Sequence, residues 1–306
     1  MIRKLFKKLN KTNSQFIEVY SLIKTLKFFI RKSQMEDFIL HCPETGTSKT
    51  RYCDREIIVS LTSYGKRIYD VCYTIESLMQ QTLKPNKIIL WLSDELQNVS
   101  LPQSLKSQIS RGLEIRYTKD IRSYKKLIPA LHEFPNAVII TVDDDAIYEF
   151  DIIDRMVQSY LGNPTKIYAT RVHRIRVDNH NNLLPYNEWE WNAPNNEDSK
   201  YLFFTGVGAV LYPPNALHPE VLNQNVFMNI CPTADDIWFN AMARLNKTEI
   251  AKVLTRTINS HDYLENPNVQ DIGLVNINVL SSQKNDIQLR AVFNKYNLFQ
   301  LLGINK

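Results

Sequence analysis

A run of three aspartates, Asp143, Asp144 and Asp145, directly follows the apolar stretch 137–142. Like charges a few ångströms apart repel and raise one another's pKa, so such a triplet needs a positive partner. A divalent cation is the simplest partner, and oxygen-only ligands suit Mg²⁺ or Mn²⁺ completed by phosphate oxygens and water. A metal held there can act as a Lewis acid toward a departing nucleoside diphosphate. The alternative is an acidic turn or helix N-terminus, in which Asp145 or Asp151 caps the next helix.

A second acidic pair, Asp235 and Asp236, opens the segment 235–245, which we expect to be a helix. A carboxylate within hydrogen-bond reach of an attacking hydroxyl can take its proton, so either aspartate is a candidate general base. The alternative is structural, because any helix favours Asp at its N-cap and first position. The sequence does not choose between the two carboxylates.

The elements that must position these residues alternate between strands and helices. We expect strands at 57–61, 87–92, 113–118 and 137–142, and helices at 68–79, 103–111 and 124–133. This alternation predicts right-handed crossovers and a mixed, mostly parallel sheet with helices on both faces. Ligands of such α/β folds bind beyond the carboxyl ends of the strands, where polar residues gather. The second half is less regular, with a helix at 151–161, a strand at 166–171 and an apolar segment at 201–214.

The stretch Val138 to Tyr148, with its three aspartates, resembles the DXD motif of GT-A (Rossmann-like) glycosyltransferases. The strand Ile57 to Tyr64 resembles the first nucleotide-binding strand of that superfamily. The resemblance is to bacterial enzymes of surface polysaccharide assembly and covers roughly residues 56–262. It implies a metal-dependent, inverting transfer of a sugar from a UDP- or GDP-sugar donor to a saccharide or lipid-linked acceptor, with Mn²⁺ or Mg²⁺ as cofactor.

The resemblance also implies roles for individual residues. Asp143 would face the ribose or the sugar and share the metal, Asp144 would belong to the donor site, and Asp145 would hold the metal. Asp235 or Asp236 would supply the base. The remaining donor-binding candidates lie at the ends of earlier strands and in one glycine segment: Thr62, Tyr64, Asp94, Lys125 or Lys126, and Gly206.

Three further features have two interpretations each. Gly206-Val-Gly-Ala209 resembles an acceptor-side glycine segment, but a tight turn explains it about as well. His261 stands where several GT-A families supply a third metal ligand, although a lone histidine is more often structural. Trp189 and Trp191 are suited to stacking on sugars and equally to core packing.

Other classes of protein remain as alternatives. A haloacid-dehalogenase-like phosphatase uses a similar acidic motif, but at the end of its first strand, whereas at least three expected strands precede Asp143. A nucleotidyltransferase would want a Gly-rich, Arg-containing loop after the first strand, and segment 62–67 has a single glycine. A sugar-binding scaffold without turnover is the non-enzymatic alternative.

Charge is concentrated at the N-terminus. Residues 1–33 carry nine Lys or Arg against Glu18 alone, which gives +8 and leaves −3 for the rest of a chain of net charge +5. Apolar residues recur there at helical spacing, which predicts a basic amphipathic helix able to lie on an anionic membrane, or else to pack one face on the body. Aromatic residues and basic patches do not alternate in the rest of the chain, which disfavours nucleic acid as a partner.

The expected organisation has four parts: a basic helical segment 1–33, a linker 34–55, a GT-A catalytic domain 56–262 and a helical or irregular C-terminal extension 263–306. The four cysteines show no disulfide framework and no C-x-x-C pair. A reducing cytoplasm is therefore the expected location, with possible peripheral attachment to the inner face of the cytoplasmic membrane.

Overall fold

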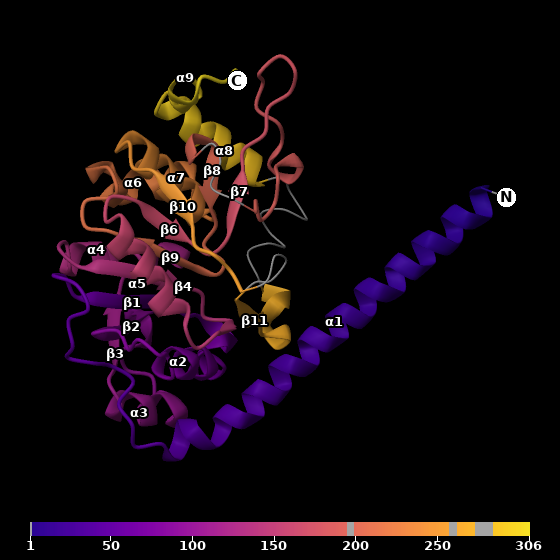
Figure 1. Ribbon diagram of the computed structural model, residues 1–306. Helices are drawn as coiled ribbons and strands as arrows, with labels where there is room; N and C mark the ends of the chain where they lie inside the picture. Colours follow the sequence, from indigo (N-terminus) through magenta and orange to yellow (C-terminus); the bar gives the residue numbers. More distant parts are fainter. Residues whose placement is uncertain (1, 195–198, 257–261, 273–283) are drawn as a thin grey trace.

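The computed structural model describes residues 2–194, 199–256, 262–272 and 284–306 (Figure 1). Its α-helices are α1 Ile2–His41, α2 Val71–Met79, α3 Gln103–Ser110, α4 Ile128–Glu133, α5 Ile152–Gly162, α6 Gln224–Ile230, α7 Asp235–Leu245, α8 Lys284–Lys295 and α9 Leu298–Leu302. Its strands are β1 Ile57–Thr62, β2 Lys87–Ser93, β3 Leu113–Thr118, β4 Val138–Val142, β5 Ala146–Tyr148, β6 Ile167–Ala169, β7 Val172–Arg174, β8 Leu202–Phe204, β9 Ala209–Tyr212, β10 Ile250–Lys252 and β11 Tyr263–Glu265. Short 3₁₀ helices include η1 Gly65–Tyr69, η2 Asp94–Leu96 and η3 Arg122–Lys126.

The central sheet of the described residues has seven strands in the order β10-β6-β9-β4-β1-β2-β3. Strands β3, β2, β1 and β4 are mutually parallel, and β9 runs antiparallel between β4 and β6. The predicted α/β fold with a mixed, mostly parallel sheet is confirmed. Because β1, β2 and β4 point the same way, their carboxyl ends meet at one edge of the sheet.

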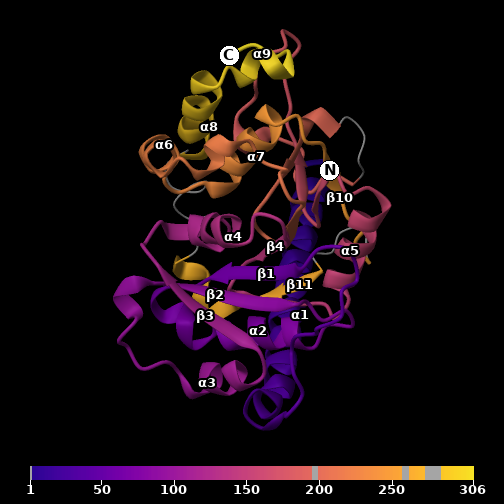
Figure 2. The ribbon, with the colours of Figure 1, turned by 90° about the vertical axis from the view of Figure 1, so that its left-hand side faces the viewer.

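Alternating side chains of the strands bury both faces of the sheet. Ile57, Val59 and Leu61 of β1 pack with α2 and α5 on one face, whereas Ile58 belongs to the core under α4 and α7. Figure 2 shows α4 and α7 on one side of the strands and α2 and α3 on the other. A strand covered on both faces is apolar throughout, which is why the runs 57–61 and 87–92 were recognisable.

Helix α1 is longer than expected and continues to His41. Residues 34–41, which we expected to form part of a linker, are helical because Met35 and Ile39 are buried against the body, in the same core as α2. The N-terminal part of α1 extends away from the body (Figure 1). No helix among the described residues is both long and apolar enough to cross a membrane.

The C-terminal residues pack on the rest of the fold. Strand β11 pairs in antiparallel fashion with β5, the strand that directly follows the aspartate triplet. Leu289, Phe293 and Leu298 of α8 and α9 join the core under α7. The division of the chain into four parts stays a prediction.

A buried ion pair links α2 to the end of α3 and to α1. The Arg111 guanidinium donates to both carboxylate oxygens of Glu76 at 2.7 and 3.1 Å, and Glu76 has no exposed surface. Arg111 also donates to the carbonyl oxygens of Phe38 and Glu44, at 3.3 and 2.8 Å. This one side chain therefore fixes the C-terminus of α1 on the body.

We expect Arg111→Met to lower the free energy of unfolding by about 3 kcal/mol, because the buried Glu76 carboxylate loses its counter-charge and keeps only the amide donors Gln80 and Gln108. Urea unfolding followed by circular dichroism measures this. The control is Lys87→Met, which breaks the partly exposed pair with Glu114 and should cost less than about 1 kcal/mol. Equal losses of unfolding free energy in the two variants would contradict the role of Arg111 in holding α1 on the body.

Candidate active site

Four of the predicted site residues lie at the carboxyl edge of the sheet. Thr62 ends β1 with Tyr64 two residues on, Asp94 follows β2, and Asp143 follows β4. Their backbones lie on neighbouring parallel strands because β1 pairs with both β2 and β4. Residues from distant parts of the sequence then add to this edge through the loops described below.

Lys126 connects the two acidic motifs. Its Nζ lies 3.1 Å from Oδ1 of Asp143 and 3.2 Å from Oδ2 of Asp235. Burial alone would lower the pKa of the Lys126 ammonium, but the two carboxylates raise it well above its usual range. A Cβ at Gly206 would lie 2.6 Å from Nζ, so the missing side chain at Gly206 is what leaves room for the ammonium. Of the two lysines considered, Lys126 is the one in contact with the aspartate triplet.

Arg67 provides the second positive charge. Its guanidinium donates to Oδ1 of Asp144 at 2.8 Å and lies 3.1 Å from Oδ2 of Asp145. Ser63 donates to the other oxygen of Asp144 at 2.5 Å. Burial raises the pKa of the Asp144 carboxyl, and Arg67 and Ser63 oppose that rise without cancelling it. Both oxygens of the middle aspartate are thus bonded within the protein.

The backbone of the triplet is fixed by β5 and the residues around β11. The amide of Asp143 donates to the Tyr148 hydroxyl at 2.9 Å, and the amide of Asn266 donates to the carbonyl of Asp145 at 2.7 Å. Arg67 also donates to the carbonyl of Val269 at 3.3 Å. The triplet is therefore a braced loop before β5, and Asp145 does not cap a helix.

Asp235 and Asp236 stand in the first turn of α7, behind Ala234 at the N-cap. Asp235 accepts a hydrogen bond from the Ser123 hydroxyl at 2.9 Å in addition to its contact with Lys126. Asp236 accepts one from the amide of Ile237 at 2.9 Å. Burial and the nearby Asp235 charge raise the pKa of the Asp236 carboxyl to about 7.

The site has more negative than positive charge. Among the described residues, five carboxylates, at positions 143–145 and 235–236, lie together with the cations Arg67 and Lys126, so negative charge exceeds the charge of these two cations when all are ionised. Burial and the neighbouring Asp145 charge raise the pKa of the Asp143 carboxyl even though Lys126 opposes them. An excess of this kind favours binding of a further cation.

Several predicted residues lie outside this cluster. The Lys125 ammonium donates to Asp120, and Thr62 donates to the carbonyl of Trp91 at 2.8 Å. Asp94 is exposed and accepts a bond from the amide of Glu95. Tyr64 is 45% exposed, with the Arg67 guanidinium 5.6 Å from its ring centre. His261 lies outside the described residues.

The two tryptophans differ in environment. Trp189 is buried in the core under α4 and α7 and donates to the carbonyl of Leu184 at 3.0 Å. Trp191 is 42% exposed and stacks on His173, with ring centres 5.0 Å apart. Core packing therefore accounts for Trp189, whereas Trp191 is partly exposed.

Arg67, Ser63 and Tyr148 are site residues that sequence reasoning missed. A basic residue shortly after the first strand was the available signal, because the aspartate triplet needed a positive partner. The sequence around Tyr148 contains no signal for a site residue, because its hydroxyl reaches Asp143 only through the turn into β5.

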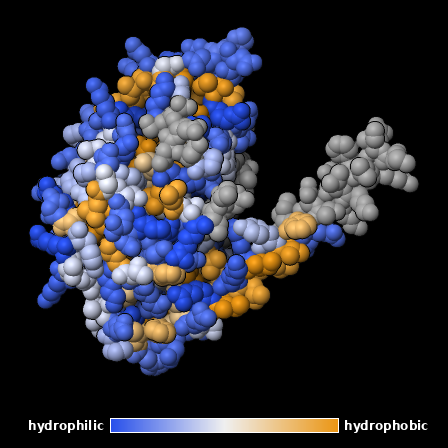
Figure 3. Space-filling model, viewed as in Figure 1, coloured by the Kyte–Doolittle hydropathy of each residue, from blue (hydrophilic) through white to orange (hydrophobic). Residues whose placement is uncertain are grey.

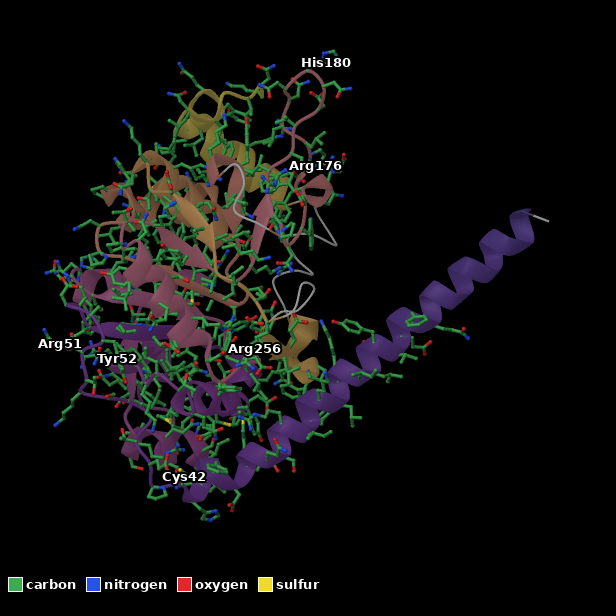
Figure 4. The ribbon with its side chains drawn as sticks, in the orientation of Figure 1. Cys42, Arg51, Tyr52, Arg176, His180 and Arg256 are labelled. Atoms are coloured by element: carbon green, nitrogen blue, oxygen red, sulfur yellow. The ribbon has the colours of Figure 1, made fainter. Side chains whose placement is uncertain are left out.

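Other charged features lie away from the cluster. Arg256, labelled in Figure 4, pairs with Asp151 at 2.5 Å and so joins the segment before β11 to the start of α5. A shallow cavity of about 330 Å³ is lined by Arg51, Glu133 and Ala137, among others. Ala137 precedes β4, so this cavity is at the opposite edge from the aspartate triplet, and Arg51 lies far from Arg256 in Figure 4.

No protein-family model matches this chain, and no curated protein sequence does. Solved structures do. TarS residues 1–349 of S. aureus in complex with UDP matches with 15% identity and a TM-score of 0.44, over 80% of this chain and 72% of that one. The mannosyltransferase PcManGT of Pyrobaculum calidifontis, with GDP-Man and Mn²⁺, matches with 13% identity and a TM-score of 0.42, over 77% and 63%. The synthetase of CMP:2-keto-3-deoxy-manno-octonic acid, with CTP, matches with 11% identity and a TM-score of 0.38, over 75% and 99%.

The predicted resemblance to GT-A glycosyltransferases is confirmed as a similarity of fold.

The pKa of Asp236 gives a pH-dependent stability. A carboxyl whose folded-state pKa is raised to about 7 binds its proton more tightly when folded, so the folded state loses stability as pH rises from about 4 past 7. Asp236→Asn removes this loss. We expect its gain in unfolding free energy at pH 8 to exceed that at pH 4.5 by at least about 1 kcal/mol.

Urea unfolding at the two pH values tests this prediction. Asp54→Asn, at an exposed position on the opposite edge, is the control and should show no pH-dependent gain. If the difference in unfolding free energy between Asp236→Asn and the wild type is the same at both pH values, the assignment of the raised pKa to Asp236 is wrong.

Proposed function

We propose that this protein is a glycosyltransferase that moves a sugar from a UDP- or GDP-sugar to a hydroxyl of a saccharide or lipid-linked acceptor, with inversion. The observation that carries the proposal is the contact of one buried lysine, Lys126, with both Asp143 and Asp235. It joins an acidic motif suited to a donor diphosphate to a second acidic motif suited to proton removal. Such a pairing is what sugar transfer to a hydroxyl requires.

Asp143 and Asp145 are the proposed metal-binding residues, and a Mn²⁺ or Mg²⁺ ion fits the oxygen-only donors and the excess of negative charge there. Within the described part of the chain, no group of three or more His, Cys, Asp or Glu is arranged to hold a metal. Phosphate oxygens and water would complete the shell, and His261 stays a proposed third ligand. When bound, the ion supplies charge neutralisation for the departing diphosphate.

Asp236 is the proposed general base. Asp235 already contacts Ser123 and Lys126, whereas the pKa of Asp236 near 7 matches proton transfer at neutral pH. Lys126 then holds Asp143 and Asp235 at a fixed separation, which fixes the base relative to the donor. Inversion follows if the acceptor hydroxyl attacks the anomeric carbon directly with Asp236 taking its proton.

The remaining proposed donor residues lie along the carboxyl edge. The exposed ring of Tyr64 and the exposed carboxylate of Asp94 can contact the base and ribose, beside Thr62. Asp144 acts through Arg67 and Ser63, because both of its oxygens are already bonded. We propose it as a positioning residue within the donor site.

The alternatives have less support. Three strands, β1 to β3, precede the aspartate triplet, whereas the phosphatase motif would end the first strand. Arg67, the arginine in the loop after β1, is engaged by Asp144 and Asp145, so it is a poor candidate for the triphosphate contact of a nucleotidyltransferase. A binding scaffold has no need for a carboxyl with a pKa near 7.

We expect Asp145→Ala to lower sugar transfer at least about 100-fold in the presence of Mn²⁺, through loss of metal and of diphosphate stabilisation. Release of UDP or GDP from a panel of nucleotide sugars, with Mn²⁺ and with EDTA, measures this. Asp54→Ala is the matched control and should behave like the wild type. Full activity of Asp145→Ala, or full activity in EDTA, would refute the role.

We also propose that α1 holds the enzyme on an anionic membrane surface, the inner face of the cytoplasmic membrane. The apolar stripe predicted from helical spacing is exposed rather than packed on the body, with exposures between 45% and 73% for Phe16, Val19, Tyr20, Ile23, Leu26 and Ile30. Figure 3 shows hydrophobic residues along this helix. The +8 charge of residues 1–33 complements anionic lipid headgroups, and Lys24 lies 5.0 Å from the Tyr20 ring centre, beside the stripe.

The double variant Leu26→Glu and Ile30→Glu should bind vesicles that contain anionic phospholipid at least about tenfold more weakly than the wild type, because two apolar anchors become charged. Co-sedimentation of the full chain measures the binding. Ile287→Glu, at an exposed apolar position on α8, is the control. The proposed membrane contact of α1 is wrong if the double variant sediments with the vesicles as the wild type does. It is also wrong if the wild type binds uncharged vesicles as tightly as anionic ones.

A further inference from the structure

Arg171 lies at the same edge of the sheet as the aspartate triplet. Strand β6 runs parallel to β4 with β9 between them, and Val142 pairs with Ala209. The amide of Thr170 donates to the carbonyl of the same Ala209 at 3.1 Å. Arg171 and Asp143 therefore each come directly after a residue that pairs with Ala209. Their backbones lie two strand spacings, or ~10 Å, apart.

The loop of Gly206 and Gly208 lies between these two residues. Gly206 adjoins the Lys126 ammonium, as described above. A Cβ at Gly208, whose φ is +97°, would lie 3.6 Å from the Tyr263 ring and 3.8 Å from Cβ of Arg171. One side of this short loop thus faces the acidic cluster and the other side faces Arg171.

The charge of Arg171 is not neutralised by a carboxylate of the described residues, in contrast to Arg67 and Lys126. Its Nε is buried and has no hydrogen-bond partner there. The guanidinium lies 5.8 Å from the ring centre of Trp191. Arg171 is partly buried, so its guanidinium keeps access to solvent and can pair with an anionic group of a ligand.

The aromatic ring of Trp191 lies next to this cation and is held in place by two other rings. The Trp191 ring stacks on the ring of His173, which is buried, and forms a T-shaped pair with Tyr186, with 6.1 Å between ring centres. These contacts hold the indole in place while 42% of the residue stays exposed. Burial and the Asp236 charge raise the pKa of Tyr186 and Arg171 opposes them, so the proposed base and Arg171 both act on one phenol.

We propose that Arg171 and Trp191 form the acceptor subsite, and that the acceptor is a saccharide carrying an anionic group, a carboxylate or a phosphate, that pairs with Arg171. This inference rests on the proposed function. A sugar that contacts the exposed part of Trp191 would lie beside Arg171, which can then pair with an anionic group on that sugar. The excess carboxylate charge of the site would repel an anionic acceptor, and Arg171 is the residue that offsets this repulsion.

The test is direct binding of acceptor probes to the full chain, without donor, by saturation-transfer NMR and calorimetry. The probes are methyl glycosides, methyl uronides and hexose 1-phosphates, each in gluco, galacto and manno configuration. We expect at least one anionic probe to bind about tenfold or more tightly than its neutral counterpart. Whether the uronide or the phosphate shows the larger gain identifies the anionic group.

Arg171→Gln should abolish the preference for the anionic probe, and Trp191→Ala should weaken the neutral and anionic probes alike. Arg51→Gln, on the opposite edge, and Phe150→Ala, an exposed aromatic, are the matched controls. Thermal unfolding of each variant verifies that it is folded.

Four outcomes overturn the proposal. In three of them no probe binds, neutral and anionic probes bind equally, or Arg171→Gln keeps the preference. Binding of the nucleotide-sugar panel in Mn²⁺ is measured in parallel by calorimetry, and failure of the wild type to bind any of these donors refutes the proposed function by itself. In the fourth outcome, Arg171→Gln binds the donor more weakly than the wild type, which would assign Arg171 to the donor site.

Discussion

The buried ammonium of Lys126 between Asp143 and Asp235 is the interaction on which the candidate site depends. A lysine is rarely buried unless paired, and here two carboxylates from distant parts of the sequence supply the pairing. The consequence is geometric as well as electrostatic. The loop after β4 and the first turn of α7 are held at a fixed separation, so a donor placed by one and a proton acceptor placed by the other keep their relative positions.

Arg67 gives the site its second constraint. By contacting Asp144 and Asp145 at once, it neutralises part of the charge of the triplet. The pairing of β11 with β5 and the bond from Asn266 to Asp145 then fix the backbone of the loop. Rigid support of this kind is what a site needs if it is to stabilise charge on a leaving group without reorganising.

The sequence was most informative where one physical rule dominated. Continuous apolar runs identified the buried parallel strands, and the carboxyl-edge rule then placed the residues after β1, β2 and β4 together. What it could not supply were contacts between distant segments. Whether Lys125 or Lys126 faces the triplet depends on the turn geometry of η3, and the position of Arg67 depends on the path of η1. The antiparallel β9 and the pairing of β11 with β5 involve three- and four-residue strands that are too short to show a period.

The most direct test of the account is Mn²⁺ binding to the purified full chain, measured by electron paramagnetic resonance with and without UDP or GDP. If the excess carboxylate charge around Asp143 and Asp145 serves a metal–diphosphate pair, one Mn²⁺ binds per chain and one of the two nucleotides tightens its binding by at least about tenfold. Absence of Mn²⁺ binding, or binding that neither nucleotide affects, would contradict the central claim.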